Sequence, residues 1–516
     1  MNAPASLMLL ADTQTVLSWL RQHGVTELAV DSRQVGARAA LGARVAFIAW
    51  PGTAEDGRAF VASALADGAA ACLVELDGAP AWGFTDERIV AVQGLKARLA
   101  EIAHQFHGRP SDQLDVVAVT GTNGKTSTAW WTAQALSRLG RPCGVIGTLG
   151  VGQPGSGQFQ PTGLTTPDPV TLHATFRAFV EGGLKAAAIE ASSIGIEEGR
   201  LDATRIKVAQ FTNFTQDHLD YHGSMQAYWR SKRALFAWPG LEAAVVNADD
   251  GRGDDLVALS CERGLALWTY SLHVPARLRV KALTIGVDGL DVLVQEFDEA
   301  LAKPVSEARA AVPLIGEFNV SNLLAVLGGL RALGVPLQDA AQACAHLSPV
   351  PGRMQAIKLP DAEPLSLPLA LVDYAHTPDA LQKALLALRG ITKARGGQLW
   401  CVFGCGGNRD PLKRPLMGAM AEQYADQVVL TSDNPRLESP AYILSQILAG
   451  VARHDGVAVI ENRHEAIAHA LRLAAPQDVV LIAGKGHEAY QDASGVKTPF
   501  SDIDEAMNAL RARRAA

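Results

Sequence analysis

A short apolar run that leads into a glycine-rich loop and then into a helical pattern constrains the fold of this chain more than any other feature. Residues 114–119 are mostly apolar, which is typical of a buried strand. Gly121–Thr126 follow as Gly-Thr-Asn-Gly-Lys-Thr, and residues 129–139 have the pattern of a helix. A strand, a glycine-rich turn and a helix N-terminus in series predict a phosphate site, because backbone N–H groups and the positive end of the helix dipole meet there.

The loop departs at one position from the general P-loop pattern, which has a glycine five residues before its second glycine, where this chain has Val119. Lys125 is nevertheless placed to reach the outer phosphates of a nucleotide, and the Thr126 hydroxyl is placed to ligate Mg²⁺. The alternative is an ordinary strand-to-helix turn that contains a lysine by chance. Gly-Lys-Thr stands where phosphate binding needs it, and this favours the nucleotide site.

The length of the chain and its alternating strands and helices predict a three-domain α/β protein. A chain of 516 residues exceeds what one hydrophobic core holds, and breaks that contain Gly and Pro fall near residues 107–111 and 348–353. We therefore expect a small α/β N-terminal domain (residues 1–108), a central P-loop ATPase-like domain with a doubly wound sheet (109–350) and a C-terminal Rossmann-like α/β domain (351–516).

Apolar runs predict where the strands lie. In the N-terminal and central domains these runs are residues 45–49, 70–75, 186–190, 208–212 and 243–247, and in the C-terminal domain 369–373, 398–403, 427–431 and 479–483. Further expectations are a strand that ends at residues 30–33, short antiparallel strands within 265–313, a helix over 319–333 and a helix that opens at Lys232.

The composition excludes several classes of protein. The net charge of −7 gives no basic surface for nucleic acid, and the first ten residues have neither the basic start nor the apolar length of a signal peptide or a membrane anchor. We therefore expect a cytoplasmic protein that binds no nucleic acid and does not insert into membranes. The six cysteines are scattered, so disulfides are not expected, and Cys401 and Cys405 lack a second pair at zinc-ligand spacing.

Polar side chains collect where strands of the central domain end. Glu190 ends one predicted strand, Asp217 and His218 follow another, and Lys232 comes soon after. An acidic residue and an imidazole beside the phosphates of a nucleotide would suit Mg²⁺, which prefers oxygen ligands. Two alternatives stay open, namely a zinc pair formed by His218 and His222 on one helix face, and a solvated helix position for Lys232.

Three loops in the last domain contain charged residues of both signs. Residues 404–410 include Arg409, residues 433–436 read Asp-Asn-Pro-Arg, and residues 484–488 read Gly-Lys-Gly-His-Glu. Each loop follows a predicted strand, so all three are expected at one edge of a sheet. Arginine binds carboxylates and glutamate binds ammonium groups, and the combination predicts a pocket for a zwitterion.

Taken together, these motifs resemble those of the Mur ligases, which use ATP to add amino acids to the peptide of a cell-wall precursor. The resemblance spans nearly the whole chain, in order: Gly121–Thr126, Glu190–Ser193, Asp217–Asp220, Lys232 with Leu235 and Phe236, Asn319 with Asn322, Pro351–Arg353, Asp373–His376 and Asp433–Arg436. The Asp-Asn-Pro-Arg sequence is similar to the signature of members that add meso-diaminopimelate rather than lysine. The resemblance implies an ATP- and Mg²⁺-dependent ligase that joins meso-diaminopimelate to UDP-N-acetylmuramoyl-L-alanyl-D-glutamate.

The resemblance also implies roles for individual residues. Those for catalysis are Lys125, Glu190, His218 and Lys232, and those for Mg²⁺ are Thr126, Glu190, His218 and Lys232, the last as a carbamylated lysine. Those for the nucleotide are Gly121, Thr122, Asn123, Gly124, Lys125, Thr126, Ser127, Asn322, Arg353 and Asp373. Those for the UDP-sugar peptide are Ser32, Thr53, Ala54, Glu55, Thr165, Thr166, Ser192, Glu198 and Arg200. Those for diaminopimelate are Arg409, Asp433, Asn434, Pro435, Arg436, Gly484 and Glu488.

The chain departs from the common pattern of the family at three positions. Ile194 stands where many relatives have histidine, Glu198 where glutamine is common, and Leu164 where asparagine often stands. These departures concern contacts to the UDP-peptide and not the chemistry. Two alternative functions are a folylpolyglutamate synthetase-like ligase, which shares the central fold, and a non-catalytic P-loop regulator. The extra N-terminal domain and the Asp-Asn-Pro-Arg sequence argue against a folylpolyglutamate synthetase. An inert regulator would have no need for Glu190, His218 and the pocket of Arg409, Arg436 and Glu488 together. We expect a monomer.

Overall fold

A computed structural model describes residues 7–52, 55–156, 158–286, 289–298, 303–359, 366–453 and 456–515. The chain divides into two compact units. The first unit comprises Met1–Ala118, Arg141–Lys207 and Trp238–Leu241, and the second comprises Val119–Gly140, Val208–Ala237 and Glu242–Ala516. The domain boundaries expected after residues 108 and 350 rest on sequence breaks and stay predictions.

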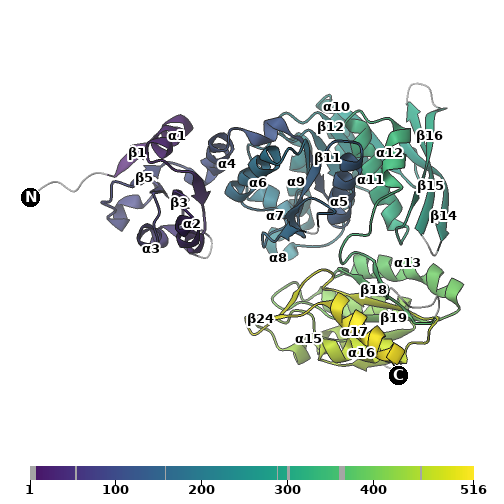
Figure 1. Cartoon of the computed structure of the whole chain (residues 1–516). Helices are drawn as coiled ribbons and strands as arrows, with labels where there is room; N and C mark the ends of the chain where they lie inside the picture. The colour runs from purple at the N-terminus through teal and green to yellow at the C-terminus, as the bar shows by residue number, and fades with distance from the viewer. Residues whose placement is uncertain are drawn as a thin grey trace, which may run out of the picture. The chain divides into compact units, whose positions relative to one another are not determined.

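The first unit contains a five-stranded parallel sheet with helices on both faces (Figure 1). Its strand order is β1-β5-β4-β3-β2, with β1 at Met8–Leu10, β2 at Glu27–Ala29, β3 at Val45–Ala49, β4 at Ala71–Glu75 and β5 at Ile89–Val92. Helices α1 (Thr13–Gln22) and α4 (Leu95–Phe106) pack on one face, and α2 (Val35–Ala40) and α3 (Val61–Ala66) pack on the other. Burial on both faces explains why the inner strands β3 and β5 are apolar throughout.

The strand that was expected to end at residues 30–33 is shorter than predicted, and that prediction is wrong. Strand β2 ends at Ala29, and residues Ser32–Gln34 form a 3₁₀ turn, η1. The Asp31 carboxylate accepts a hydrogen bond from the backbone N–H of Arg33 at 3.0 Å and so caps this turn.

A second group of strands in the first unit leads to candidate site residues. Strand β10 (Ala186–Glu190) pairs in parallel with β7 (Cys143–Gly147). Strands β8 (Gly150–Gly152) and β9 (Phe159–Gln160) continue the order by antiparallel pairing. The remaining helices of the first unit are η2 (Gly57–Phe60), η3 (Ala79–Trp82), η4 (Pro110–Gln113), α6 (Pro169–Glu181) and α7 (Ser193–Glu197).

Helices α4 and α6 bury a group of histidines in the first unit. The rings of His104 and His173 lie 4.9 Å apart, and His173 is fully buried. Burial lowers the pKa of His173 to about 3 and that of His107 to about 4. Both side chains are therefore neutral in the folded protein at neutral pH.

We expect acid to destabilise the protein through these histidines. Below pH 6.5 the unfolded chain takes up protons that the folded chain resists, so stability is fully present above that pH and falls as the pH drops towards the folded values. At pH 5, His173 alone is expected to lower the free energy of unfolding by about 2 kcal/mol relative to pH 7. Urea unfolding at both pH values measures this. His173→Phe should flatten the pH dependence, and an equal loss in this variant would contradict the assignment.

The second unit contains the glycine-rich loop and a largely parallel set of strands. Strand β6 (Asp115–Thr120), whose last two residues belong to this unit, runs into the loop, and α5 (Lys125–Arg138) follows it. Strands β11 (Val208–Phe211), β12 (Ala243–Asn247) and β13 (Ala266–Ser271) are parallel to one another. Strand β14 (Leu278–Gly286) is paired antiparallel with β15 (Gly289–Asp298), and β15 with β16 (Lys303–Val312). The expected antiparallel strands are thus present, and they are longer than predicted.

The helices of this part of the second unit include one correction. They are α8 (Leu219–His222), α9 (Met225–Ala234), η5 (Leu235–Ala237), α10 (Gly253–Glu262), α11 (Phe318–Ala332) and α12 (Leu337–Cys344). The prediction that Lys232 opens a helix is wrong. Helix α9 begins at Met225, because the Ser224 hydroxyl caps it by accepting from the Ala227 N–H at 3.2 Å. Lys232 therefore lies in the last turn of α9.

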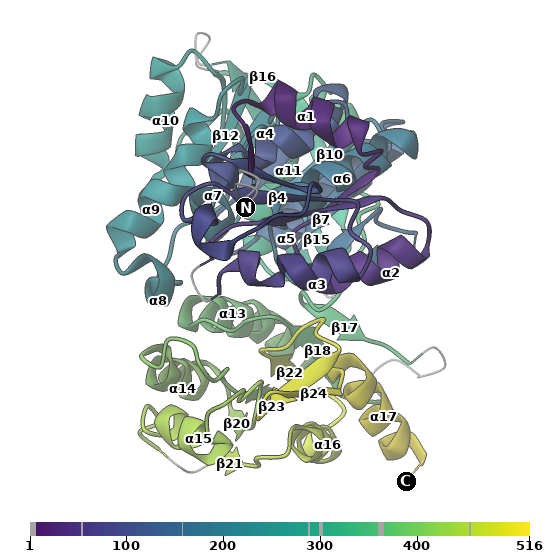
Figure 2. The same cartoon turned by 90° about the vertical axis from the view of Figure 1, so that its left-hand side faces the viewer.

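The C-terminal part of the second unit is a doubly wound sheet (Figure 2). Its order is β17-β18-β22-β19-β20-β21, and only β17 (Gln355–Ile357) runs antiparallel to its neighbour. The other strands are β18 (Leu369–Asp373), β19 (Leu399–Phe403), β20 (Gln427–Leu430), β21 (Val457–Val459) and β22 (Val479–Ala483). Helices α13 (Pro378–Arg395), α14 (Lys413–Tyr424) and α15 (Pro440–Leu448) cover one face, and α16 (Arg463–Leu473) and α17 (Asp502–Ala515) cover the other.

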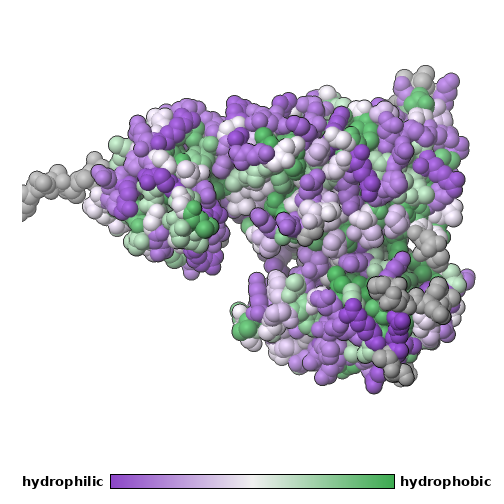
Figure 3. All heavy atoms as spheres, in the orientation of Figure 1, coloured by the Kyte–Doolittle hydropathy of each residue, from purple (hydrophilic) through white to green (hydrophobic). Residues whose placement is uncertain are grey.

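A small hairpin of β23 (Tyr490–Ala493) and β24 (Val496–Pro499) completes the second unit. Figure 3 shows hydrophilic residues (purple) over much of the face drawn, with hydrophobic residues (green) between them. Within the described ranges, no helix is both long enough and apolar enough to cross a bilayer.

Candidate active site

Two glycines give the loop between β6 and α5 its shape. Gly121 has φ 150° and Gly124 has φ 85°, and side chains rarely adopt either conformation. A Cβ on Gly124 would also collide with Asn322 Oδ1, and one on Gly121 would collide with Thr212 Oγ1. Gly124 caps α5 without a side-chain hydrogen bond, so the first N–H groups of α5 point out of the helix end. This end of α5 has the geometry of an anion site.

Asn213, two residues beyond the end of β11, makes hydrogen bonds that fix the loop. Its carbonyl accepts from the Thr122 N–H at 2.8 Å, and its side-chain oxygen accepts from the Asn123 N–H at 2.9 Å. Its side-chain amide donates to the Asn123 carbonyl at 3.0 Å. The Thr122 and Asn123 amides thus fix the loop, and the amides at the start of α5 are the candidates for phosphate binding. Sequence reasoning missed Asn213, whose signal was an asparagine at the end of a strand beside a glycine-rich loop.

Two lysines converge on one carbonyl of the loop. Lys125 Nζ donates to the carbonyls of Gly121 and Thr122, each at 2.9 Å, and Lys232 Nζ donates to the Gly121 carbonyl at 2.7 Å. Lys232 is only 1% exposed. Burial, with a contribution from Lys125, lowers the pKa of Lys232 well below its usual value. The interpretation of Lys232 as a solvated helix lysine is therefore wrong.

His218 and Asp217 interact electrostatically with these lysines. His218 takes a left-handed conformation (φ 53°) where α8 begins, and its Nε2 is 3.6 Å from Asp217 Oδ2. Burial lowers the pKa of His218, which keeps its imidazole neutral and able to ligate a metal. Within the described ranges, no group of three or more His, Cys, Asp and Glu side chains could hold a metal by itself.

A cavity of about 370 Å³ lies in the second unit. Six predicted nucleotide residues line it, namely Asn123, Gly124, Ser127, Asn322, Arg353 and Asp373. Asn322 Nδ2 donates to Asn319 Oδ1 at 3.0 Å, which orients both amides. Burial raises the pKa of Asp373, whose carboxylate accepts from two backbone N–H groups at 2.7 and 2.8 Å. The cavity has the size and polarity of a small-ligand site.

Arg353 connects this cavity to the glycine-rich loop. Its Nη2 donates to Thr126 Oγ1 at 3.0 Å, and its guanidinium lies 4.5 Å from the centroid of the Tyr374 ring. Tyr374 also lines the cavity, although sequence reasoning gave it no role. A fixed guanidinium beside the threonine hydroxyl adds positive charge where phosphates would lie.

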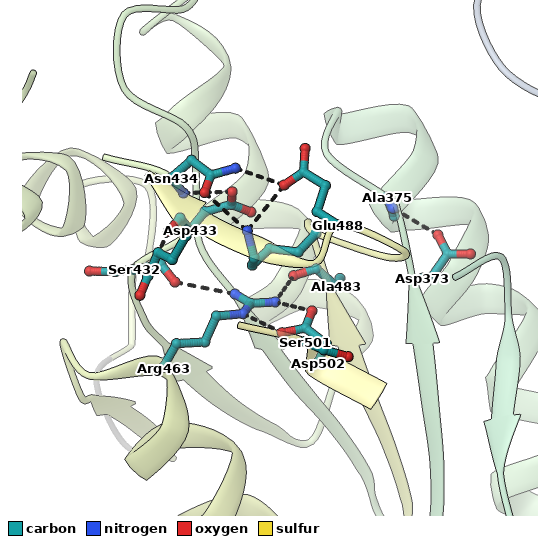
Figure 4. A network of polar contacts seen from close by, with 12 residues as sticks. Asp373, Ala375, Ser432, Asp433, Asn434, Arg463, Ala483, Glu488, Ser501 and Asp502 are labelled. Atoms are coloured by element: carbon teal, nitrogen blue, oxygen red, sulfur yellow. Dashed lines mark hydrogen bonds and ion pairs between the residues drawn. The ribbon is translucent and has the colours of Figure 1, made fainter. Parts of the chain in front are cut away.

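Hydrogen bonds join the three charged loops of the C-terminal sheet. The Gly407 N–H donates to the Asn434 carbonyl at 2.9 Å, and Arg436 Nη1 donates to the Gly407 carbonyl at 2.7 Å. Asn434 Nδ2 donates to Glu488 Oε2 at 2.7 Å (Figure 4). A Cβ on Gly484 would collide with Asp433 Oδ2. The structure thus brings together the loops that contain Arg409, Asp433, Asn434, Pro435, Arg436, Gly484 and Glu488.

A buried ion pair between Arg463 and Asp502 lies next to the start of two of these loops. Arg463 binds both oxygens of Asp502 at 2.7 Å, and both side chains are fully buried (Figure 4). The same guanidinium donates to the carbonyl of Ala483 at 2.9 Å and to that of Ser432 at 3.3 Å. These carbonyls directly precede the loops at 433–436 and 484–488, so the pair fixes where both loops begin.

Predicted site residues of the first unit form a cluster of their own. Thr166 Oγ1 donates to the Glu190 carbonyl at 2.7 Å and lies 2.9 Å from Ser192 Oγ. Arg200 Nη1 donates to the Thr166 carbonyl at 3.1 Å. The Glu190 carboxylate accepts from the N–H of Thr148 at 2.8 Å and from its hydroxyl at 3.2 Å. The Thr148 hydroxyl is also 3.1 Å from that of Thr165. Sequence reasoning gave a role to Thr165 but missed Thr148.

The remaining predicted residues of the first unit lie outside this cluster. Glu198 forms an ion pair with Lys96 at 2.8 Å. Ser32 is the first residue of η1, and Glu55 is exposed. Thr53 and Ala54 lie outside the described residues.

Comparison with known proteins identifies the family of this chain. Residues 119–330 match the Mur ligase middle domain, and residues 352–486 match the Mur ligase, glutamate ligase domain. A protein of Acidovorax sp. (strain JS42), named UDP-N-acetylmuramoyl-L-alanyl-D-glutamate–2,6-diaminopimelate ligase, is 52% identical over 99% of both chains. The chain belongs to the Mur ligase family. A relative of the same name from Pseudomonas aeruginosa is 48% identical over 90% of this chain and 92% of its own.

Solved structures of Mur ligases extend the comparison to the fold. A diaminopimelate ligase structure has a TM-score of 0.64 and 33% identity and covers 95% of both chains. A folylpolyglutamate synthase structure from Mycobacterium tuberculosis, complexed with ADP and AMPPCP, has a TM-score of 0.59 and 19% identity, covers 75% of this chain and 92% of its own, and shows shared fold alone. The predicted fold is confirmed: this Mur ligase has the three-domain α/β architecture of the family.

Proposed function

We propose that this Mur ligase joins meso-diaminopimelate to the D-glutamate of UDP-N-acetylmuramoyl-L-alanyl-D-glutamate at the expense of ATP, in the synthesis of peptidoglycan precursors. The observation that carries the choice of amino acid is the joined loop system in which Arg436, Asn434 and Glu488 meet. The names of relatives at 44–52% identity over nearly the full length support the same reaction.

The chemistry requires activation, because a carboxylate and an amine do not form an amide directly. The γ-carboxylate oxygen of D-glutamate attacks the γ-phosphorus of ATP, and ADP leaves. The amine of diaminopimelate then attacks the acyl carbon, phosphate leaves and the nitrogen loses a proton. Lys125 and Arg353 provide positive charge at the start of α5, where the transferred phosphoryl group needs stabilisation.

Two side chains of the second unit fit a Mg²⁺ ion that shares its ligands with phosphate, since Thr126 offers a hydroxyl and His218 a neutral imidazole. The resemblance to the family adds the carboxylate of Glu190, which ends β10 in the first unit. We assign these three side chains and a modified Lys232 to the metal. Bound there, Mg²⁺ would neutralise phosphate charge.

We further propose that Lys232 is carbamylated. Burial lowers the pKa of its amine and so raises the neutral fraction, and only a neutral amine adds to CO₂. The nitrogen forms a bond to the carbon of CO₂ and releases one proton, which leaves a carboxylate-like group. The modification replaces a cation near the phosphate loop with an oxygen ligand of the kind Mg²⁺ prefers.

The first unit supplies the candidate site for the UDP-sugar peptide. We assign to it the cluster of Thr165, Thr166, Ser192 and Arg200 and, from sequence alone, Ser32, Thr53, Ala54, Glu55 and Glu198. Since Glu198 is paired with Lys96, we expect it to orient that lysine as well. We also propose a cytoplasmic location and a monomeric state.

Arg436 is expected to select diaminopimelate over lysine. Its guanidinium is held at the loop by the Gly407 carbonyl and can fork onto the distal carboxylate that lysine lacks. L-Lysine lacks this carboxylate and would leave the Arg436 guanidinium unpaired. We therefore expect kcat/KM for L-lysine to be at least ~100-fold lower. Arg436→Ala should raise the KM for diaminopimelate far more than that for ATP. Similar kcat/KM values for both amino acids in the wild type would contradict this role.

One assay tests the proposed function as a whole. ADP release should require UDP-N-acetylmuramoyl-L-alanyl-D-glutamate and meso-diaminopimelate together, and mass spectrometry should find the tripeptide product. ADP release with a folate and glutamate instead would indicate a folylpolyglutamate synthetase-like ligase. Nucleotide binding without any ligation would indicate a regulator.

A further inference from the structure

Lys485, in the loop after β22, is fully buried and contacts two residues of the proposed amino-acid pocket, Asn434 and Glu488. Its Nζ donates to Asn434 Oδ1 at 3.0 Å, to Glu488 Oε2 at 3.1 Å and to the Tyr490 carbonyl at 2.6 Å. An ammonium group has three N–H donors, and these three oxygens use all of them. Lys485 therefore has no donor left for a ligand, and any effect on a ligand must pass through its partners.

The first partner, Asn434, is held in one amide orientation. Its Oδ1 accepts from Lys485 and also from the Asp492 N–H at 2.9 Å, and its Nδ2 donates to Glu488 Oε2 at 2.7 Å. If the amide were turned over, its NH₂ would face two donors and its oxygen would face a carboxylate. Lys485 thus decides which end of Asn434 reaches Glu488.

The second partner, Glu488, is held by only one of its two oxygens. Oε2 accepts from both Asn434 and Lys485, whereas the other carboxylate oxygen points away from this network in Figure 4. Within the part of the chain that the structure describes, Oε1 takes part in no hydrogen bond with another residue. The carboxylate is thereby fixed in direction and still has one oxygen to offer an ammonium group.

We infer that Lys485 is a positioning residue for the amino-acid substrate: it fixes Asn434 and the Glu488 carboxylate so that the pocket receives the ammonium group of diaminopimelate. The inference rests on the proposed function for the identity of the substrate. None of the three residues to which Lys485 donates a hydrogen bond lines the nucleotide cavity, so its effect should fall on the amino acid and not on ATP. A misplacement of about 1 Å can cost ~100-fold in rate, so a freed carboxylate should matter.

The test is a double-mutant cycle of Lys485→Met and Glu488→Gln. Lys485→Met should raise the KM for diaminopimelate by about 30-fold and leave the KM for ATP within about two-fold of the wild-type value. Because Lys485 acts through Glu488, the double variant should be no worse than Glu488→Gln alone. Multiplied effects of the two substitutions, or equal rises in both KM values, would overturn the inference.

Stability controls separate positioning from folding. Trp400→Phe removes a buried hydrogen bond to Asp478 in the same sheet and touches neither Asn434 nor Glu488, so it should lower Tm without changing the KM for the amino acid. Lys485→Gln, which retains a donor, serves in the cycle if Lys485→Met is unfolded, and it should restore part of the affinity. If neither Lys485 variant folds while Trp400→Phe does, Lys485 is a stability residue and the inference is wrong.

The cycle uses whichever amino acid the wild-type enzyme ligates best. This separates the test of diaminopimelate as the substrate from the test of the role of Lys485. Ligation of a different amino acid with intact coupling would overturn diaminopimelate as the substrate and support the role of Lys485. Efficient ligation of diaminopimelate without coupling would overturn the role of Lys485 alone. A wild-type protein that ligates no amino acid would overturn both.

Discussion

Lys125→Met is expected to lower kcat by about 10³-fold, because it removes the flexible cation at the start of α5 that is placed to follow the transferred phosphoryl group. In the structure the ammonium group is held by two carbonyls of its own loop, Gly121 and Thr122, and a phosphate would compete for it. Those two hydrogen bonds contribute modestly to folding, so the Tm should change by only a few degrees. Steady-state ADP release and a thermal melt measure the two effects.

The control for this variant is Lys281→Met, which removes an exposed lysine that pairs with Glu307 on β16. It should leave both kcat and Tm near the wild-type values. A Lys125→Met protein that ligates at a normal rate would contradict the phosphate role, and one that is unfolded would assign Lys125 to stability instead.

Lys232→Ala is expected to lose activity by about 10³-fold, because a metal ligand beside the phosphates is lost with it. The substitution leaves space where the buried side chain lay next to Tyr228 and the Gly121 carbonyl. Acetate or formate at high concentration should enter this space and restore part of the activity, since a free carboxylate replaces the carbamate. ADP release is measured against carboxylate concentration.

Lys232→Met is the matched control, because its side chain fills the same space and leaves no room for a carboxylate. It should be as inactive as Lys232→Ala and should not respond to acetate. An unmodified Lys232 in a nucleotide-bound crystal of active enzyme would exclude carbamylation. Equal rescue of both variants would show that acetate acts elsewhere.

Much of the fold follows from the sequence because the central strands are buried on both faces. Strands β10, β12, β18 and β22 begin and end at the predicted residues, since an uninterrupted apolar run between polar ends marks such a strand. The short edge strand β1 was not predicted, because three residues with two exposed side chains leave no clear pattern. At β2 the Asp31 cap, a local hydrogen bond, ended the strand earlier than its apolar pattern suggested.

The candidate site was less predictable, because burial of a charged residue depends on packing from distant parts of the chain. From its residues alone Lys232 could be a solvated helix lysine, and Lys485 in its glycine-rich loop was given no role, yet both are buried. The oxygens that surround Lys485 come from positions 434, 488 and 490, and only the sheet topology brings the first of them near. Motifs could place the glycine-rich loop in the sequence. The role of Asn213, which fixes this loop by hydrogen bonds, became clear only from the structure.

The brace that Asn213 provides has a consequence for the thermodynamics of nucleotide binding. Glycine-rich loops have many accessible conformations, and ordering one on ligand binding costs conformational entropy. Here Asn213 accepts two hydrogen bonds from the loop and donates one to it, and Thr212 Oγ1 donates to the Asn123 carbonyl at 2.6 Å. These bonds restrict the loop within the protein itself. Most of the ordering cost is therefore met when the chain folds, and the affinity for a nucleotide depends mainly on the contacts it makes rather than on organising the loop that receives it.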